Sequence, residues 1–140
     1  MIEILLTDLK EDNFYEETLG TIERICDDYS IENHFGTLSM ANQMVCDYLM
    51  SHSFLPVDVT FRIDNSEVSF EYSLQNGDFK FFAQSESNEN TALFVLNQLA
   101  DEIMFSTDYD VITTTFHVKT KFAIQRAVQR ERVISHFANF

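Results

Sequence analysis

The sequence predicts an α+β fold, a two-layer sandwich with helices on one face of a mixed β-sheet. Segments with the helical periodicity of apolar residues are interspersed with segments rich in β-branched and aromatic residues. Their order is strand, helix, helix, strands, helix, strands. The chain has 140 residues, and its 45% hydrophobic content fits one folded domain. Three glycines and one proline predict short connections, and 14 phenylalanines predict an aromatic core.

The N-terminal part predicts one strand and two helices. Residues Ile2 to Thr7 form a short apolar strand, and a helix is expected from about Phe14 to Tyr29. A second, more apolar helix is expected from about Phe35 to His52. Apolar residues of the first helix recur at steps of three and four positions, which predicts one buried face. These residues are Leu19, Ile22, Ile25, Cys26 and Tyr29.

The middle of the chain predicts an antiparallel hairpin. Residues Val57 to Ile63 and Val68 to Leu74 have strand composition and are joined by an Asp-Asn-Ser turn. Asn76-Gly77 is a further turn signal, after which Phe79 to Ala83 is expected to be a third strand. The polar residues 84–90 are expected to form a loop.

One helix and two strands complete the predicted domain. The helix runs from about Thr91 to Glu102, with Asn90 as its N-cap. The strands cover about Ile103 to Ser106 and Val111 to Val118. We therefore expect one domain over residues 1–118.

Residues 119–140 are expected to form a basic extension of that domain. Five of the nine basic residues of the chain lie here: Lys119, Lys121, Arg126, Arg130 and Arg132. The periodicity predicts an amphipathic helix from Lys121 to Phe137, with a basic side opposite an apolar one. Such a helix would pack on its own domain or dock on a partner or sister subunit, and the sequence leaves both alternatives open.

The charge of the chain excludes some classes of partner. A formal charge of −14 repels phosphate backbones and anionic lipid surfaces, so neither nucleic acid nor a membrane is expected as a partner. The first residues lack a basic region and a cleavage pattern, which predicts no signal peptide and a cytoplasmic location. Two unspaced cysteines and four scattered histidines predict neither a disulfide framework nor a metal site.

Residues 90–102 carry a resemblance to a known family. The run Leu96-Asn97-Gln98-Leu99-Ala100-Asp101-Glu102 is similar to a helix of the histidine-kinase-like (GHKL) ATPase domain, specifically of the anti-sigma-factor serine kinases. Residues Ser39 to His52 resemble the metal-binding helix of that family, and Thr115 to Val118 resemble its last strand. The resemblance covers about residues 1–118 and implies a Bergerat-like ATP-binding fold.

The resemblance also implies where catalytic groups would stand. The family places a carboxylate and an amide one helical turn apart, to polarise the attacking hydroxyl and to bind Mg²⁺. Met44 and Tyr48 occupy these positions here, and His52 matches a histidine common in the family. A register shifted by one residue would offer Gln43 and Asp47, of which Asp47 alone would ligate Mg²⁺. No catalytic residue is therefore expected.

The implied adenine and phosphate positions also differ from the family pattern. Leu74 or Gln75 stands where an aspartate would accept the adenine amino group, and Gly77 is the one glycine that clearly remains. Asp78 would replace the aspartate if the turn were rebuilt. Asn90 and Ala92 stand where glycines would let backbone amides approach phosphates.

Together these positions predict a vestigial pocket. Its residues are Met44, Asp47, Tyr48, His52, Gln75, Gly77, Asp78, Asn90 and Ala92. The resemblance thus implies a catalytically degenerate regulatory protein that binds a sigma factor or an anti-sigma antagonist and forms a homodimer. No cofactor is expected, although the sequence leaves the binding of Mg-ATP open. The alternatives are an active or weakly active ATP-binding serine kinase that uses Asp47, and an interaction module of unrelated helix-plus-sheet fold.

Overall fold

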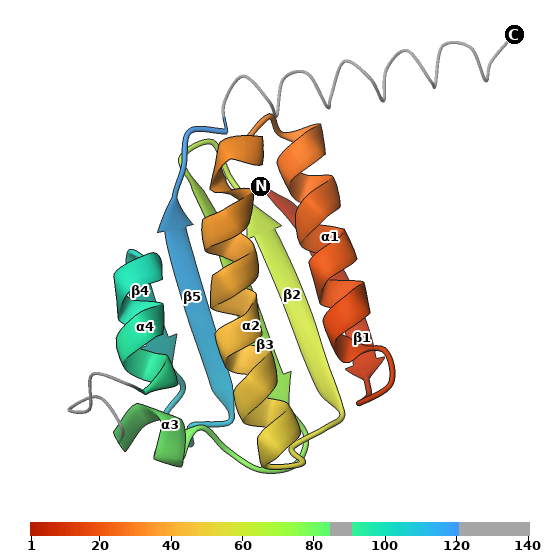
Figure 1. The fold of residues 1–140 in the computed structure, drawn as a ribbon, viewed down its shortest axis with the longest axis vertical. Helices are drawn as coiled ribbons and strands as arrows, with labels where there is room; N and C mark the ends of the chain where they lie inside the picture. The colour runs from red at the N-terminus through yellow and green to blue at the C-terminus, as the bar shows by residue number, and fades with distance from the viewer. Residues whose placement is uncertain (85–90, 121–140) are drawn as a thin grey trace, which may run out of the picture.

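A computed structural model describes residues 1–84 and 91–120 of the chain. The helices and strands, in chain order, are β1 (Ile2–Leu9), α1 (Phe14–Asp28), the 3-10 turn η1 (Glu32–His34), α2 (Phe35–Ser51), β2 (Val57–Ile63), β3 (Glu67–Leu74), α3 (Lys80–Gln84), α4 (Ala92–Leu99), β4 (Glu102–Phe105) and β5 (Val111–His117). The fold is α+β (Figure 1).

The strands form one five-stranded sheet in the order β1-β2-β3-β5-β4. All four neighbouring pairs are antiparallel, so the predicted mixed sheet was wrong. The reason lies in the first crossover. One helix between β1 and β2 would return the chain for a parallel pairing. Here two helices, α1 and α2, connect the strands and reverse the chain direction once more. Strand β2 is therefore antiparallel to β1.

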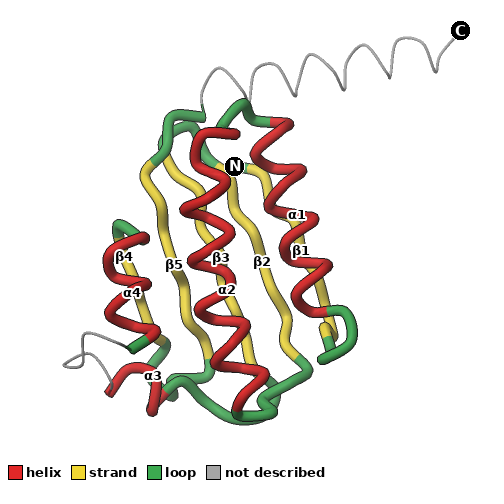
Figure 2. The backbone as a smooth tube through the Cα atoms, in the orientation of Figure 1, coloured by secondary structure: helices red, strands yellow, loops and turns green. Residues whose placement is uncertain are grey.

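Helices α1, α2 and α4 lie on one face of the sheet, which makes two layers (Figures 1 and 2). Buried and half-buried residues alternate strictly along β2 and β3, because successive side chains point to opposite faces. The buried rows carry Phe61, Phe70 and Tyr72, and the rings of Phe61 and Phe70 meet edge to face at 5.2 Å. The core therefore sits between the sheet and α1 and α2.

The prediction of a strand from Phe79 to Ala83 was wrong, because residues 80–83 belong to helix α3 and Phe79 directly precedes it. Phe79 and Phe82 are three positions apart, a spacing that places both on one helical face, and both are buried. The Asp78 side chain accepts a hydrogen bond from the Lys80 backbone amide at 2.9 Å and so starts α3. Burial of the two rings in a helical turn outweighs the strand preference of the aromatic run.

Helix α4 is shorter at both ends than predicted. Its N-cap is Thr91, whose hydroxyl accepts from the Phe94 amide, so the prediction of Asn90 was wrong. At the other end Ala100 is extended, and the Asp101 carboxylate accepts from the His117 amide at 2.6 Å. This bond joins residue 101 to β5, and the chain continues as strand β4 from Glu102.

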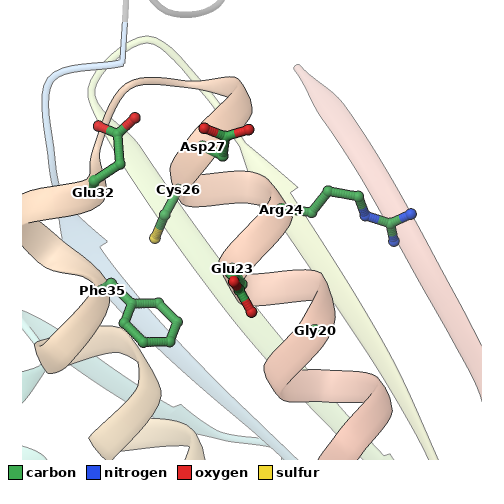
Figure 3. Close-up of a pocket in the computed structure, with 7 residues that line it drawn as sticks. All are labelled: Gly20, Glu23, Arg24, Cys26, Asp27, Glu32 and Phe35. Atoms are coloured by element: carbon green, nitrogen blue, oxygen red, sulfur yellow. The ribbon is translucent and has the colours of Figure 1, made fainter.

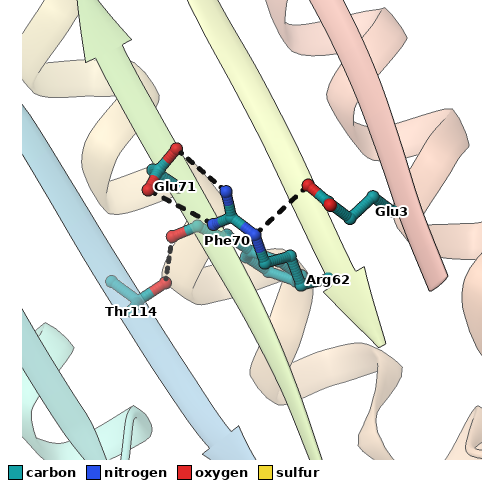
Figure 4. A network of polar contacts seen from close by, with 5 residues as sticks. All are labelled: Glu3, Arg62, Phe70, Glu71 and Thr114. Atoms are coloured by element: carbon teal, nitrogen blue, oxygen red, sulfur yellow. Dashed lines mark hydrogen bonds and ion pairs between the residues drawn. The ribbon is translucent and has the colours of Figure 1, made fainter. Parts of the chain in front are cut away.

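The other face of the sheet carries polar side chains and no helix of the described residues. Arg62 on β2 links its neighbours, with its Nε 3.4 Å from Glu3 on β1 and its Nη1 3.2 Å from Glu71 on β3 (Figure 4). On the opposite, core-facing side, Thr114 of β5 is buried, and its hydroxyl donates to the Phe70 carbonyl oxygen of β3 (Figure 4). The side chains of these ion pairs are partly exposed to solvent. Each pair therefore contributes at most about 1 kcal/mol to stability.

Two predicted segments lie outside the described residues, namely most of the loop 84–90 and the helix 121–137. Residues 118–120 are attached to the turn between β2 and β3. The Val118 amide donates to the Ser66 carbonyl oxygen, and Thr120 donates to Asn65 and Asp64 carbonyl oxygens. A boundary at residue 118 stays a prediction. Among the residues described, we find no helix with the length and apolar character that crossing a membrane requires.

Candidate functional site

The nine vestigial pocket positions do not all come together in the structure. A groove lies between α2 and α4 and has a volume of about 410 Å³. Its lining residues are Met44, Asp47, Tyr48, Ser51, Thr91, Ala92 and Val95. Four of the nine predicted positions are thus brought together here. His52 packs against Tyr48, the positions Gln75, Gly77 and Asp78 lie in the connection between β3 and α3, and Asn90 lies outside the described residues.

Tyr48 is the centre of the aromatic cluster, which consists of Tyr48, His52, Phe54, Phe79 and Phe82. The Tyr48 ring stacks on Phe79 at 5.7 Å and meets Phe82 edge to face at 5.1 Å. It also lies 4.3 Å from the His52 ring and 6.1 Å from the Phe54 ring. Only 7% of Tyr48 is exposed. The seam between α2 and α3 is therefore filled by aromatic rings.

A hydrogen bond fixes the Tyr48 ring in this seam. Its hydroxyl donates to the Asp78 backbone carbonyl oxygen at 2.9 Å. Burial raises the pKa of the Tyr48 phenol above its usual value, so the hydroxyl stays a donor near neutral pH. The Asp78 carboxylate is engaged with the Lys80 amide. Asp78 is therefore a helix-starting residue here, and its carboxylate is not among the groove-lining groups.

The local structure explains why position 77 is a glycine. Its φ is +91°, a region that disfavours residues with a Cβ, and a Cβ built there would lie 2.2 Å from the Phe54 ring. Two positions earlier, Gln75 is exposed. Leu74 is buried in β3 opposite Val57. The residues 74–77 thus serve the sheet and the turn, and neither side chain at 74 or 75 lines the groove.

His52 closes the last turn of α2. Its Nδ1 lies 2.9 Å from the Tyr48 carbonyl oxygen and 3.1 Å from the Ser51 hydroxyl. A proton on Nδ1 would let the ring donate to that carbonyl, which also accepts from the His52 backbone amide and the Ser51 hydroxyl. The His52 ring is exposed and also lies 5.7 Å from the Phe81 ring. It therefore acts as a helix-end residue and as the outer edge of the aromatic cluster.

Asp47 is the one carboxylate among the described residues that line the groove. It is exposed on α2, and the groove's other polar side chains are the phenol of Tyr48 and the hydroxyls of Ser51 and Thr91. One exposed carboxylate would supply a single ligand to a cation, far fewer than Mg²⁺ takes. Within residues 1–84 and 91–120 no group of three His, Cys, Asp or Glu side chains is placed to hold a metal ion.

The two cysteines are buried thiols. Burial raises the pKa of Cys26 to about 11, with a smaller contribution from Glu32. Burial likewise raises the pKa of Cys46 to about 12, although a hydrogen bond with Thr18 lowers it. Thiolates are the reactive form of cysteine, so neither group is suited to nucleophilic chemistry.

Sequence reasoning missed the partners of Tyr48. Phe54, Phe79 and Phe82 come from a loop, the start of a turn and a short helix, and none of them follows a helical or strand periodicity with residue 48. The available signal was composition, because four phenylalanines occur between residues 54 and 82 outside the two strands. Composition shows that rings are present but does not pair them.

No protein-family model matches the sequence, and no curated protein matches it at a significant level. The resemblance to the anti-sigma-factor serine kinases therefore stays a prediction that depends on residues 90–102 and on the order of the elements.

Proposed function

We propose that this chain is a catalytically degenerate regulatory protein that acts by binding another protein, as the resemblance to anti-sigma-factor serine kinases implies. The partner class is a sigma factor or an anti-sigma antagonist, and a homodimer is the proposed assembly. The fold proposed for it is the Bergerat-like member of the two-layer α+β class. The proposed location is the cytoplasm.

The filled seam beside α2 carries this proposal. In the implied family a nucleotide lies against this helix, with the carboxylate and the amide facing it. Here Tyr48 turns its ring toward Phe79 and Phe82 and its hydroxyl to the Asp78 carbonyl oxygen. Opening this space for a nucleotide would separate packed aromatic rings, each of which buries a large apolar area. The groove that remains beside α4 has few polar groups for phosphates.

Exposed apolar side chains support a protein-binding role. Phe81 next to the aromatic cluster is 66% exposed, and Met104 on the outer strand β4 is 59% exposed. Exposed aromatic and methionine side chains are enriched where proteins bind one another. Phe81 lies at the edge of the seam, so a partner there would contact the face where the family binds nucleotide.

A weakly active kinase is the second candidate, and Asp47 is the observation that favours it. Its carboxylate borders the same groove as the N-terminal end of α4. Backbone amides at such an end attract anions, and a carboxylate across from them would hold a cation. This candidate requires measurable binding of Mg-ATP.

Calorimetric titration with Mg-ATP separates the two candidates. We expect no heat of binding up to millimolar nucleotide. Micromolar binding that Asp47→Ala abolishes, and that the matched exposed-carboxylate variant Asp27→Ala retains, would establish the kinase candidate in place of our proposal.

A binding assay with sigma factors and their antagonists from the same genome tests the regulatory role. We expect a complex with one of them on size-exclusion chromatography, weakened by Phe81→Ser. Leu5→Ser is the matched control, because it removes an apolar side chain of similar exposure from β1, an edge strand that takes no part in the proposed surface. Failure of every such protein to form a complex would reject the proposed partner class.

A further inference from the structure

A second groove lies on the other side of α2, between α1 and the start of α2. Its volume is about 630 Å³, and its surface is mostly apolar. The lining residues are Gly20, Glu23, Arg24, Cys26, Asp27, Glu32 and Phe35. Gly20 widens it, because a Cβ built there would meet nothing within 4 Å.

The groove has an apolar floor and an acidic rim. Figure 3 shows the Cys26 sulfur and the Phe35 ring directed into the space between the two helices, while Arg24 points away from it. Glu23, Asp27 and Glu32 are exposed around this floor. The raised pKa of Cys26 reflects burial first and the Glu32 charge second, which agrees with a negative potential in the groove. Such a groove suits an amphipathic, basic segment.

The chain itself contains a segment with this chemistry. Residues 121–140 hold four basic residues and one acidic residue, a net charge of +3, within a chain of formal charge −14. Residues 1–120 alone therefore carry −17. The apolar positions of the segment include Ile124, Val128 and Ile134, and its basic positions include Arg126 and Arg130. Opposite charge on the two parts favours their association and adds specificity to apolar contact.

The segment starts at the end of the molecule where α1 ends and α2 begins. Hydrogen bonds hold Thr120 to the turn between β2 and β3. In Figure 1 this end of the described chain lies at the same end of the molecule as the last turn of α1 and the start of α2. Twenty residues in helical form would span about 30 Å at 1.5 Å per residue. Helix α1 has 15 residues, so the segment is long enough to follow the groove.

We propose that the groove between α1 and α2 is the docking site of residues 121–140 of the same chain. The apolar side of the segment covers Phe35, Cys26 and the open backbone at Gly20. Its arginines lie against the carboxylates of the rim. Docking offsets part of the acidic charge of α1 and removes the apolar floor from water. This inference is independent of the proposed function.

Paramagnetic broadening in the full chain tests the docking. A nitroxide label is attached at Gln129→Cys, while the native thiols, buried and with raised pKa values, react slowly. We expect the amide signals of Gly20 and Asp27 to lose most of their intensity. Signals of Thr60, on the opposite face of the sheet, should keep theirs.

Charge variants show whether the rim holds the segment. Glu23→Lys combined with Asp27→Lys should restore the groove signals. The matched control combines Glu102→Lys with Asp108→Lys, which changes the net charge equally at exposed positions on and after β4, and it should leave the broadening intact. Unchanged amide spectra elsewhere verify that each variant is folded.

Three results would overturn the proposal. These are an absence of broadening at the groove, stronger broadening on the open sheet face, and broadening that persists in the rim variant. In a mixture of spin-labelled chain without isotope and isotope-labelled chain without spin label, broadening would show docking from a second copy. That outcome would contradict assignment to the same chain.

Discussion

The two sides of helix α2 are packed by different chemistry, although each contains a tyrosine hydroxyl that donates a hydrogen bond. On the α1 side, Tyr72 donates to Asn42 Oδ1 at 2.7 Å, and Asn42 donates to the Thr18 hydroxyl at 2.9 Å. All three side chains are fully buried. On the α3 side, Tyr48 donates to a backbone carbonyl oxygen and is otherwise surrounded by rings.

The difference shows two ways to fix a helix on a sheet. In the polar network Thr18–Asn42–Tyr72 every member satisfies another, so one wrong substitution leaves a buried polar group without a partner. In the aromatic cluster the rings contribute mainly by area, so removal of the ring matters more than loss of its hydroxyl. The comparison therefore predicts opposite sensitivities to polar and to size changes.

Removal of the Tyr48 ring should have the largest effect. Tyr48→Ala empties the centre of the aromatic cluster and should lower the free energy of unfolding by about 3 kcal/mol. Tyr48→Phe keeps the ring and loses one hydrogen bond, which should cost about 1 kcal/mol. Urea denaturation measures both values. Equal losses in the two variants would show that the hydroxyl, and not the ring, holds the seam.

A polar change on the other side should come next. Asn42→Leu keeps the side-chain size but leaves the Tyr72 hydroxyl without its acceptor, which should cost about 2 kcal/mol. Combining it with Tyr72→Phe removes both partners, so the double variant should be more stable than the sum of the single losses predicts, by about 1 kcal/mol. Strict additivity in this cycle would contradict a coupled network.

The turn beneath the aromatic cluster gives a third test. Gly77→Ala forces a Cβ into a φ of +91° and against the Phe54 ring, so we expect a loss of about 2 kcal/mol. Combination with Phe54→Ala should remove the steric part and leave the backbone part. Denaturation of the single and double variants separates the two contributions. A Gly77→Ala protein as stable as the wild type would mean that the turn relaxes freely.

The smallest expected effect is a gain on the α1 side. Gly20 lies in the interior of α1 with open space around it, so Gly20→Ala should raise the free energy of unfolding by about 0.5–1 kcal/mol. Gly36→Ala is the matched control, because that glycine has equally open surroundings but lies in the first turn of α2. A smaller gain is expected there. Thermal denaturation is sensitive enough to rank the two.

Most elements could be predicted because their signals are local. The hairpin of residues 57–63 and 67–74 lies where its composition placed it, within one residue, since period-two alternation is written into each strand. The helix ends and the 79–83 segment could not be predicted as well. There the outcome depends on Asp101 reaching His117 and on Phe79 and Phe82 reaching Tyr48, contacts that no local window contains.

The candidate site shows the same division. The sequence placed Met44, Asp47, Tyr48 and Ala92 in one region, and the structure brings them to one groove. It did not show that Asp78 starts a helix or that Phe54 covers Gly77. Binding of a protein partner by this chain stays a prediction.

By itself, the sequence determined the α+β class, the buried faces of the helices and strands, and the acidic character of the body. Tertiary structure alone decided that every neighbouring strand pair is antiparallel and that aromatic rings fill the seam beside α2. The physical reason is the sequence separation between the residues that make contact. Periodicity and capping act over a few residues, whereas Asp78, Phe79 and Phe82 lie about 30 positions from Tyr48 and meet it only after the helices have packed on the sheet.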